Sequence, residues 1–190
     1  MFESMVTPDR IAPERVRPLR RSEYDQLVEL GAFHDERVEL LRGVLVEMTP
    51  QDPAHALVIS RLYRLLDRPL PAGLIVRAQS PLAVSDDSEP EPDLAIVPDD
   101  DYRRAHPTRA VLVVEVAGSS IKKDRELKAA LYAEAGVEEY WIVDLGKGVV
   151  ELYREPAGGA YRVREVRGRG ETVSPAQLPA ISVRIDDFMP

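Results

Sequence analysis

The chain has 190 residues, a formal net charge of −8 and no cysteine. A chain of this length fits one domain and can bury a sizeable core. The lack of cysteine excludes a disulfide framework and a thiolate metal site, and no apolar run is long enough to cross a membrane, so we expect a cytoplasmic protein with no membrane partner. The acidic balance argues against a surface coated in cations for nucleic acid, although it leaves room for a local basic groove.

The N-terminal region contains two predicted segments. Residues 1–18 hold three prolines and scattered charges, which predicts an extended arm in front of a single domain at residues 19–190. The run Ser22-Glu23-Tyr24-Asp25 resembles a capping box and predicts a short helix at residues 22–30 that stops at Gly31.

A hairpin and a longer helix follow. Residues 38–48 predict a β-hairpin around a turn-compatible Arg-Gly pair, and Glu39 lies on its first strand. Apolar residues at helical spacing predict a helix at residues 53–67. His55 sits in its first turn at the edge of the apolar face, where it is either a satisfied structural group or a catalytic base.

Two further short strands are predicted at residues 74–77 and 82–84. Gln79 lies between them. It is either a satisfied amide at a strand end or a group that lines a site.

The next two apolar runs, at residues 93–97 and 111–116, predict a hairpin with a long polar connection. If the strands pair antiparallel so that Val97 faces Val111, Asp93 lies directly opposite Glu115, with Cβ atoms about 5 Å apart on one sheet face. Two carboxylates on an apolar surface repel each other and lose hydration. A bridging Mg²⁺ or Mn²⁺ would resolve the conflict, and so would a buried ion pair with a nearby arginine or lysine.

A helix is predicted after the Gly-Ser-Ser sequence at residues 118–120. Asp124, Lys128 and Tyr132 are spaced i, i+4, i+8 on one face of it, and Gly136 is a plausible stop. The first turns of this helix can reach back over the two carboxylates. Lys128 is then either a charge placed on a phosphoryl group or a solvated helix lysine.

Strands at residues 139–144, 149–154 and 161–166 continue the chain, and the tail at residues 185–188 is expected to pack back onto the core. Together the elements predict an α+β domain, with a mixed central sheet flanked by helices and with β-hairpin additions.

Several short motifs together resemble the PD-(D/E)XK nuclease superfamily, and more closely its Uma2 family (also called DUF820) of restriction-endonuclease-like proteins. The resemblance spans about residues 18–188. It is carried by Glu39-Leu40-Leu41-Arg42-Gly43, Val46-Glu47-Met48, His55, Gln79-Ser80-Pro81-Leu82, Glu91-Pro92-Asp93-Leu94, Val113-Val114-Glu115-Val116, Asp124-Arg125-Glu126-Leu127-Lys128, Tyr132-Ala133-Glu134-Ala135-Gly136-Val137 and Glu139-Tyr140-Trp141-Ile142-Val143-Asp144.

This resemblance implies a restriction-endonuclease-like fold and a Mg²⁺- or Mn²⁺-dependent endonuclease that hydrolyses phosphodiester bonds, with DNA as its partner. Asp93 and Glu115 would bind the metal, Glu39 would be a third acidic group and Lys128 the catalytic lysine. Further site-lining residues would be His55, Gln79, Asp124 and Tyr132.

One departure from the superfamily pattern concerns the lysine. It usually lies two residues after the acidic residue, where this chain has Ala117. Lys128 is the natural substitute, and Lys122 and Lys123 are nearer rivals.

Two other classes of function remain open. A non-catalytic module would keep the fold and bind nucleic acid or protein, because function belongs to the site and not to the fold. An oligomeric structural protein would use the edges of the meander strands for pairing. We also expect a homodimer or higher homo-oligomer, since nucleases that cut both strands commonly act as symmetric pairs.

Overall fold

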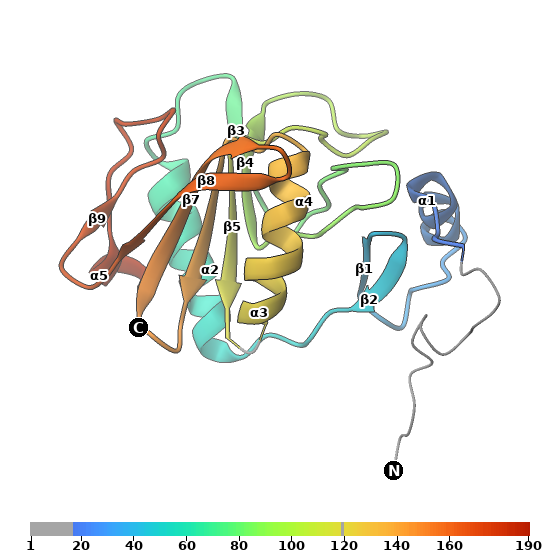
Figure 1. The fold of residues 1–190 in the computed structure, drawn as a ribbon, viewed down its shortest axis with the longest axis horizontal. Helices are drawn as coiled ribbons and strands as arrows, with labels where there is room; N and C mark the ends of the chain where they lie inside the picture. Colours follow the sequence, from blue (N-terminus) through green and yellow to red (C-terminus); the bar gives the residue numbers. More distant parts are fainter. Residues whose placement is uncertain (1–16, 119) are drawn as a thin grey trace, which may run out of the picture.

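A mixed six-stranded sheet forms the centre of the fold, with the strand order β3-β4-β5-β6-β7-β8 (Figure 1). The structure, a computed structural model, describes residues 17–118 and 120–190. Neighbouring strands are antiparallel except β5 and β6, which are parallel. The strands are β3 (Leu74–Ala78), β4 (Leu94–Pro98), β5 (Leu112–Ala117), β6 (Glu139–Asp144), β7 (Val149–Ala157) and β8 (Ala160–Arg167). This arrangement confirms the predicted α+β class and its mixed central sheet.

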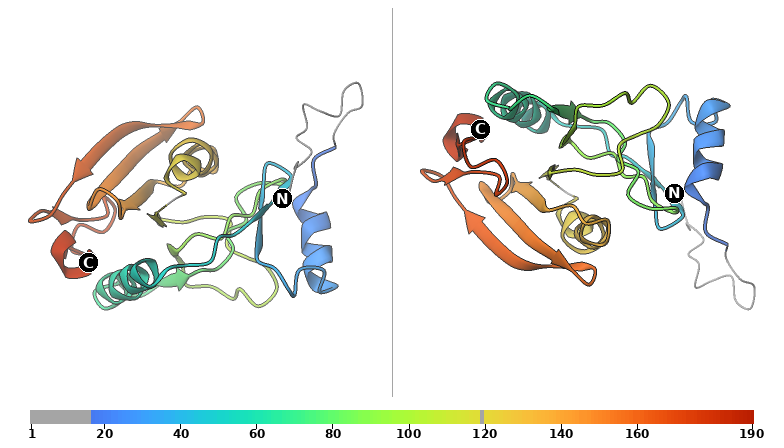
Figure 2. Two further views of the ribbon diagram at one scale, coloured as in Figure 1. Left: turned by 90° about the horizontal axis from the view of Figure 1, so that it is seen from below. Right: turned by 90° about the horizontal axis from the view of Figure 1, so that it is seen from above.

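Helices cover both faces of the sheet (Figure 2). Helix α2 (Pro53–Asp67) packs on one face, and the short helix α5 (Ile185–Phe188) lies against it. The connection between the parallel strands β5 and β6 packs on the other face. It consists of α3 (Ile121–Lys123), a π-helical turn η2 (Asp124–Lys128) and α4 (Ala129–Glu134).

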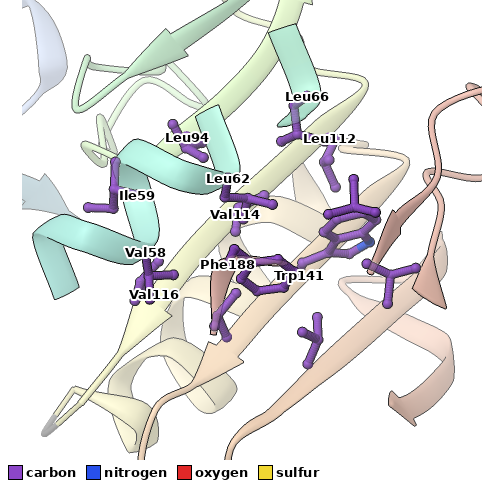
Figure 3. Packing of buried hydrophobic residues seen from close by; sticks show 14 of the residues in the cluster. Val58, Ile59, Leu62, Leu66, Leu94, Leu112, Val114, Val116, Trp141 and Phe188 are labelled. Atoms are coloured by element: carbon purple, nitrogen blue, oxygen red, sulfur yellow. The ribbon is translucent and has the colours of Figure 1, made fainter. Parts of the chain in front are cut away.

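The core beneath α2 is aliphatic apart from Trp141 and Phe188 (Figure 3). The helix contributes side chains at helical spacing, which places them all on the face toward the sheet. Burying each such side chain contributes roughly 1.5–3 kcal/mol. The main members on the two sides of the contact are Val58, Ile59, Leu62, Leu66, Leu94, Leu112, Val114 and Val116.

The core beneath α4 is richer in tyrosine. The ring centroids of Tyr132 and Tyr140 lie 5.0 Å apart, and Tyr153 continues the row at 5.7 Å from Tyr140. Ala95 and Val113 share this core, so the alternating positions of β4 and β5 that include Glu115 face α4.

A separate hairpin lies outside the main sheet, as Figure 1 shows. Strand β1 (Val38–Leu41) pairs with β2 (Val44–Glu47) across the predicted Arg-Gly turn. Gly43 has φ +73°, and a Cβ at this position would lie 2.9 Å from the backbone nitrogen of Leu19, so a larger residue would have to displace the chain. Helix α1 (Arg21–Glu29) is tied to the hairpin, because the Tyr24 hydroxyl donates to the carbonyl oxygen of Val38 at 2.9 Å.

Most predicted elements are confirmed, and α2 and β6 have the expected bounds. The strand predicted at residues 82–84 is wrong. The backbone N–H groups of Leu82 and Ala83 donate to Pro90 and Pro107, in two different segments, so no ladder forms. Helix α1 begins one residue earlier than predicted and its N-cap is Arg20.

The predictions for the two ends of the chain have different outcomes. The predicted arm falls largely on residues 1–16, which lie outside the described residues. The tail packs on the core as expected, with Phe188 fully buried. The small pair β9 (Thr172–Val173) and β10 (Val183–Arg184) was not predicted. Within residues 17–118 and 120–190, no helix has both the length and the apolar character that crossing a bilayer requires.

Candidate active site

The register of β4 and β5 brings Asp93 beside Glu115. Leu94 pairs with Val114 in the last rung of this ladder, which is the predicted register, and Asp93 lies one residue beyond it. The Oδ2 atom of Asp93 accepts a hydrogen bond from the backbone N–H of Val116 at 2.8 Å. The side chain of Asp93 is therefore fixed against the strand that carries Glu115.

Glu115 is buried beneath the helical segment. Its Oε1 atom accepts from the ammonium group of Lys128 at 2.9 Å and from the hydroxyl of Tyr132 at 2.8 Å. Burial raises the pKa of Glu115 to about 8 although Lys128 opposes the shift, and the nearby carboxylates of Asp124 and Asp93 raise it further. The carboxyl group thus takes up a proton more readily than a solvated glutamate.

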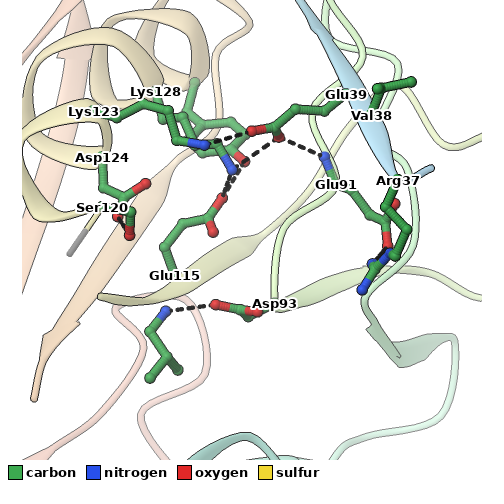
Figure 4. A network of polar contacts seen from close by, with 12 residues as sticks. Arg37, Val38, Glu39, Glu91, Asp93, Glu115, Ser120, Lys123, Asp124 and Lys128 are labelled. Carbon is green, nitrogen blue, oxygen red and sulfur yellow. Dashed lines mark hydrogen bonds and ion pairs between the residues drawn. The ribbon is translucent and has the colours of Figure 1, made fainter. Parts of the chain in front are cut away.

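Glu39 reaches the same place from the separate hairpin. Its two oxygens face two lysines, with Oε1 at 2.8 Å from Lys123 Nζ and Oε2 at 3.0 Å from Lys128 Nζ. The backbone N–H of Glu91 adds a longer hydrogen bond to Oε2 at 3.3 Å. Burial alone would raise the pKa of Glu39, but the two lysines lower it below its ordinary value, so this carboxylate is ionised. Figure 4 shows Glu115 between Lys128 and Asp93, with Glu39 beyond the lysine.

The π-helical turn is what presents two lysines to one carboxylate. Residues five positions apart are separated by about 140° around an α-helix, which has 3.6 residues per turn. In η2 the backbone N–H of Ala129 donates to the carbonyl of Asp124, five residues earlier, so residues at this spacing fall nearly one above the other. Lys123 and Lys128 therefore point to the same side of the helical segment, and both contact Glu39.

Asp124 lies at the start of this turn and is buried. The hydroxyl of Ser120 donates to its Oδ2 atom at 2.6 Å. Burial raises the pKa of Asp124, while Lys128 and Ser120 act against the shift. Asp124 thus adds a further acidic group next to Lys128.

His55 contacts Asp93 from the first turn of α2. The side chain of Asp52 caps this helix by accepting the backbone N–H of His55 at 2.9 Å. The Nε2 atom of His55 lies 3.0 Å from Asp93 Oδ2. Burial alone would lower the pKa of His55, but the hydrogen bond to Asp93 raises it above its ordinary value. The imidazole therefore helps to orient Asp93.

These side chains surround a cavity of about 110 Å³, large enough for an ion with several waters. Its mouth is formed by the segment before α2 and by an ion pair between Arg37 and Glu91. Gln79 and Tyr132 are not among the described residues that line it. The backbone of Gln79 donates to the Asp93 carbonyl at 3.0 Å, and Tyr132 lies beneath Glu115. The lining residues predicted from the sequence are Glu39, His55, Asp93, Glu115, Asp124 and Lys128.

The donor set suits a hard cation that keeps water. Among the described residues no protein donor bonds to Asp93 Oδ1 or Glu115 Oε2, whereas both oxygens of Glu39 are engaged by lysines. No group of three or more acidic or histidine side chains in the described part of the chain is arranged to hold an ion. Mg²⁺ is commonly bound through only one or two carboxylates, with waters and substrate phosphates completing its shell. The two open oxygens fit that pattern.

Two residues that line the cavity are not clearly marked in the sequence. Lys123 is predicted only as a rival to Lys128, and Arg37 is not predicted at all. Lys123 precedes the π-helical turn, and nothing in the local sequence marks that turn. Arg37 and Glu91 are 54 residues apart, and only the folded hairpin brings them together.

Comparison with known proteins finds a matching family model and a similar solved structure. A family model, Uma2, described as "Putative restriction endonuclease", matches residues 21–186. The fold resembles a crystal structure described as that of a putative nuclease belonging to DUF820 from Anabaena variabilis, with a TM-score of 0.72 and 14% sequence identity. The likeness covers 90% of this chain and 97% of the other. None of the curated proteins matches the chain.

Proposed function

The chain belongs to the Uma2 family, whose model is described as a putative restriction endonuclease, and from this membership we propose that it is a metal-dependent nuclease hydrolysing phosphodiester bonds in DNA. The observation that carries the proposal is the pair Asp93 and Glu115. Both carboxylates line one cavity, each keeps an oxygen without a protein donor among the described residues, and a buried lysine lies against Glu115. Glu115 is buried, has a raised pKa and lies next to a lysine, and such groups are typical of functional sites.

In this proposal Asp93 and Glu115 would hold Mg²⁺ or Mn²⁺. When bound, the ion would supply a Lewis acid that activates water and offsets charge on the scissile phosphate. The protein's own groups fix the two ligands. His55 and the Val116 N–H orient Asp93, and Lys128 with Tyr132 orients Glu115.

In this proposal Glu39 holds two lysines and does not bind the metal. Because its oxygens face Lys123 and Lys128, it keeps both ammonium groups at the cavity. Positive charge held in a buried site stabilises a developing phosphoryl charge more strongly than it would in water.

The test is cleavage of single- and double-stranded DNA with Mg²⁺ or Mn²⁺, comparing the wild type with Asp93→Ala. A matched control is Asp99→Ala, because Asp99 is an exposed aspartate just after β4 and lies outside the cavity. The proposal expects metal-dependent cutting that Asp93→Ala abolishes and Asp99→Ala leaves intact. Absence of cutting together with absence of metal binding in calorimetry would refute it and favour the non-catalytic binding module, which the net charge of −8 and the Ala at position 117 also suit.

A further inference from the structure

Two lysines contact the same carboxylate but differ in their access to solvent. Lys123 and Lys128 each lie within 3.0 Å of a Glu39 oxygen, and both line the cavity. The side chain of Lys128 is 3% exposed, whereas that of Lys123 is 31% exposed. Lys123 is therefore the more accessible of the two lysines to a molecule that enters the cavity.

Lys123 also has more unused hydrogen-bond donors than Lys128. An ammonium group has three protons to donate. Lys128 uses two of them on buried carboxylates, Glu115 at 2.9 Å and Glu39 at 3.0 Å. Within the described residues, the one ion pair of Lys123 is with Glu39 at 2.8 Å. Lys123 can thus bind a second acceptor without giving up its first.

Moving Lys128 toward a substrate would cost much more free energy than moving Lys123. A buried carboxylate that loses its only counter-charge is strongly destabilised, and Lys128 is the one cation in contact with Glu115 among the described residues. Glu39, in contrast, would keep Lys128 and the Glu91 N–H if Lys123 turned away.

We propose that Lys123 is the lysine that contacts the substrate's phosphate, and that Lys128 is a positioning residue that holds Glu115 and Glu39. The proposal rests on the nuclease function above, since it names the residue that meets the phosphodiester in that same site. The π-helical turn makes these two roles possible, because it brings a partly exposed lysine and a buried lysine to one side of the helical segment.

Fluorescence anisotropy of a labelled DNA oligonucleotide, single- and double-stranded, tests this contact without requiring cleavage. The measurements use Ca²⁺ in place of Mg²⁺ over a series of salt concentrations. Lys123→Met should weaken binding by about tenfold, the effect of one hydrogen bond between charged groups. It should also reduce the slope of log affinity against log salt by about one, as expected for the loss of one phosphate contact.

Lys122→Met is the matched control. Lys122 is the adjacent lysine on α3, is exposed and does not line the cavity, so its removal changes the net charge equally. The control should leave affinity within about twofold of the wild type, because Lys122 is exposed and outside the cavity, so it makes no phosphate contact and its charge is screened by salt. Urea unfolding midpoints that agree for both variants and the wild type would show that neither change acts through the fold.

The positioning role of Lys128 has its own readout. Lys128→Met should move the pH profile of Mn²⁺ affinity upward, because Glu115 loses the cation that favours its charged form. Lys123→Met should leave that profile in place, since Lys123 contacts Glu39 and not Glu115.

Three results would overturn the inference. They are equal DNA affinity for Lys123→Met and Lys122→Met, no DNA binding by the wild type, and cutting that survives Lys123→Met. The proposed nuclease is judged separately by metal-dependent cutting. Cutting that survives Lys123→Met would refute the inference and leave the nuclease standing. A selective loss of binding in Lys123→Met, with neither cutting nor metal binding by the wild type, would refute the nuclease and support the phosphate contact.

Discussion

Removing the charge of Lys128 should strongly destabilise the protein. Lys128→Met keeps a chain of similar length but leaves Glu115 with the Tyr132 hydroxyl as its only side-chain partner among the described residues. Glu39 loses one of two cations and keeps Lys123. Where Glu115 is charged, above its pKa of about 8, breaking this buried ion pair by removing one partner costs about 3–5 kcal/mol, and a domain is stable by only about 5–15 kcal/mol. We expect a folded variant with roughly half of its stability lost.

The dependence on pH distinguishes lost charge pairing from lost packing. Without Lys128 the pKa of Glu115 should rise above its value of about 8, while the unfolded chain titrates near 4.5. Between these two pKa values the folded state keeps a proton that the unfolded state has released. The variant should therefore lose stability as the pH rises from about 5 to 9.

Urea unfolding at pH 6, 7 and 9, followed by circular dichroism, measures both effects. Adding Glu115→Gln to Lys128→Met removes the charge that was left unpaired, and coupling between contacting residues typically amounts to about 0.5–3 kcal/mol. The double variant should therefore be more stable than Lys128→Met alone, most clearly at pH 9. A loss below about 1 kcal/mol in Lys128→Met, or a double variant no more stable than the single one, would refute the reasoning.

Metal binding, a second buried glutamate and a turn glycine provide three further predictions. Mn²⁺ binding should release about one proton below pH 8 and tighten as the pH rises toward 8, because burial raises the pKa of Glu115 to about 8. Calorimetry in buffers of different ionisation enthalpy measures the number of protons released. An affinity that does not change with pH would contradict Glu115 as a ligand. Burial also raises the pKa of Glu89 to about 7, so the folded protein loses stability as the pH rises from 4.5 to 7. Glu89→Gln should remove this pH dependence and raise the free energy of unfolding at pH 8 by about 3 kcal/mol, as measured by urea unfolding. A variant with the same pH profile as the wild type would contradict this prediction. Gly43→Ala should lower the melting temperature by several degrees more than Gly73→Ala, because both glycines have positive φ but only Gly43 would meet neighbouring atoms; equal shifts in calorimetry would mean that the chain yields at Leu19.

Local patterns predicted the elements that hold the site. Helix α2 was predictable because its apolar residues follow the helical period and Pro69 lies beyond its end. The register of β4 and β5 agrees with the antiparallel pairing that was assumed from the sequence, in which the ends of two short apolar runs meet at Val97 and Val111. That register is sufficient to bring Asp93 beside Glu115, so the centre of the site follows from the pairing of two strands.

Tertiary contacts account for what the sequence did not reveal. The π-helical turn η2 replaces an α-helical hydrogen bond, and the ion pairs of Lys123 and Lys128 with Glu39 accompany it, across 84 residues in the case of Lys123. The segment at residues 82–84 has the composition of a strand, but its N–H groups are taken by two separate loops. Neither outcome is encoded in the local sequence pattern.

The position of Glu39 on a separate hairpin has a consequence for local unfolding. The hairpin is joined to residues 86–89 by a few backbone hydrogen bonds, such as Glu89 N–H to Leu40 and Gly43 N–H to Asp87, and β2 is largely exposed. Units held in this way open with less free energy than the central sheet does. Amide hydrogen exchange should therefore be faster in β1 and β2 than in β5. Each such opening would withdraw Glu39 from both lysines while the main sheet stays folded, so the intact site would be present only for the fraction of time that the hairpin is closed.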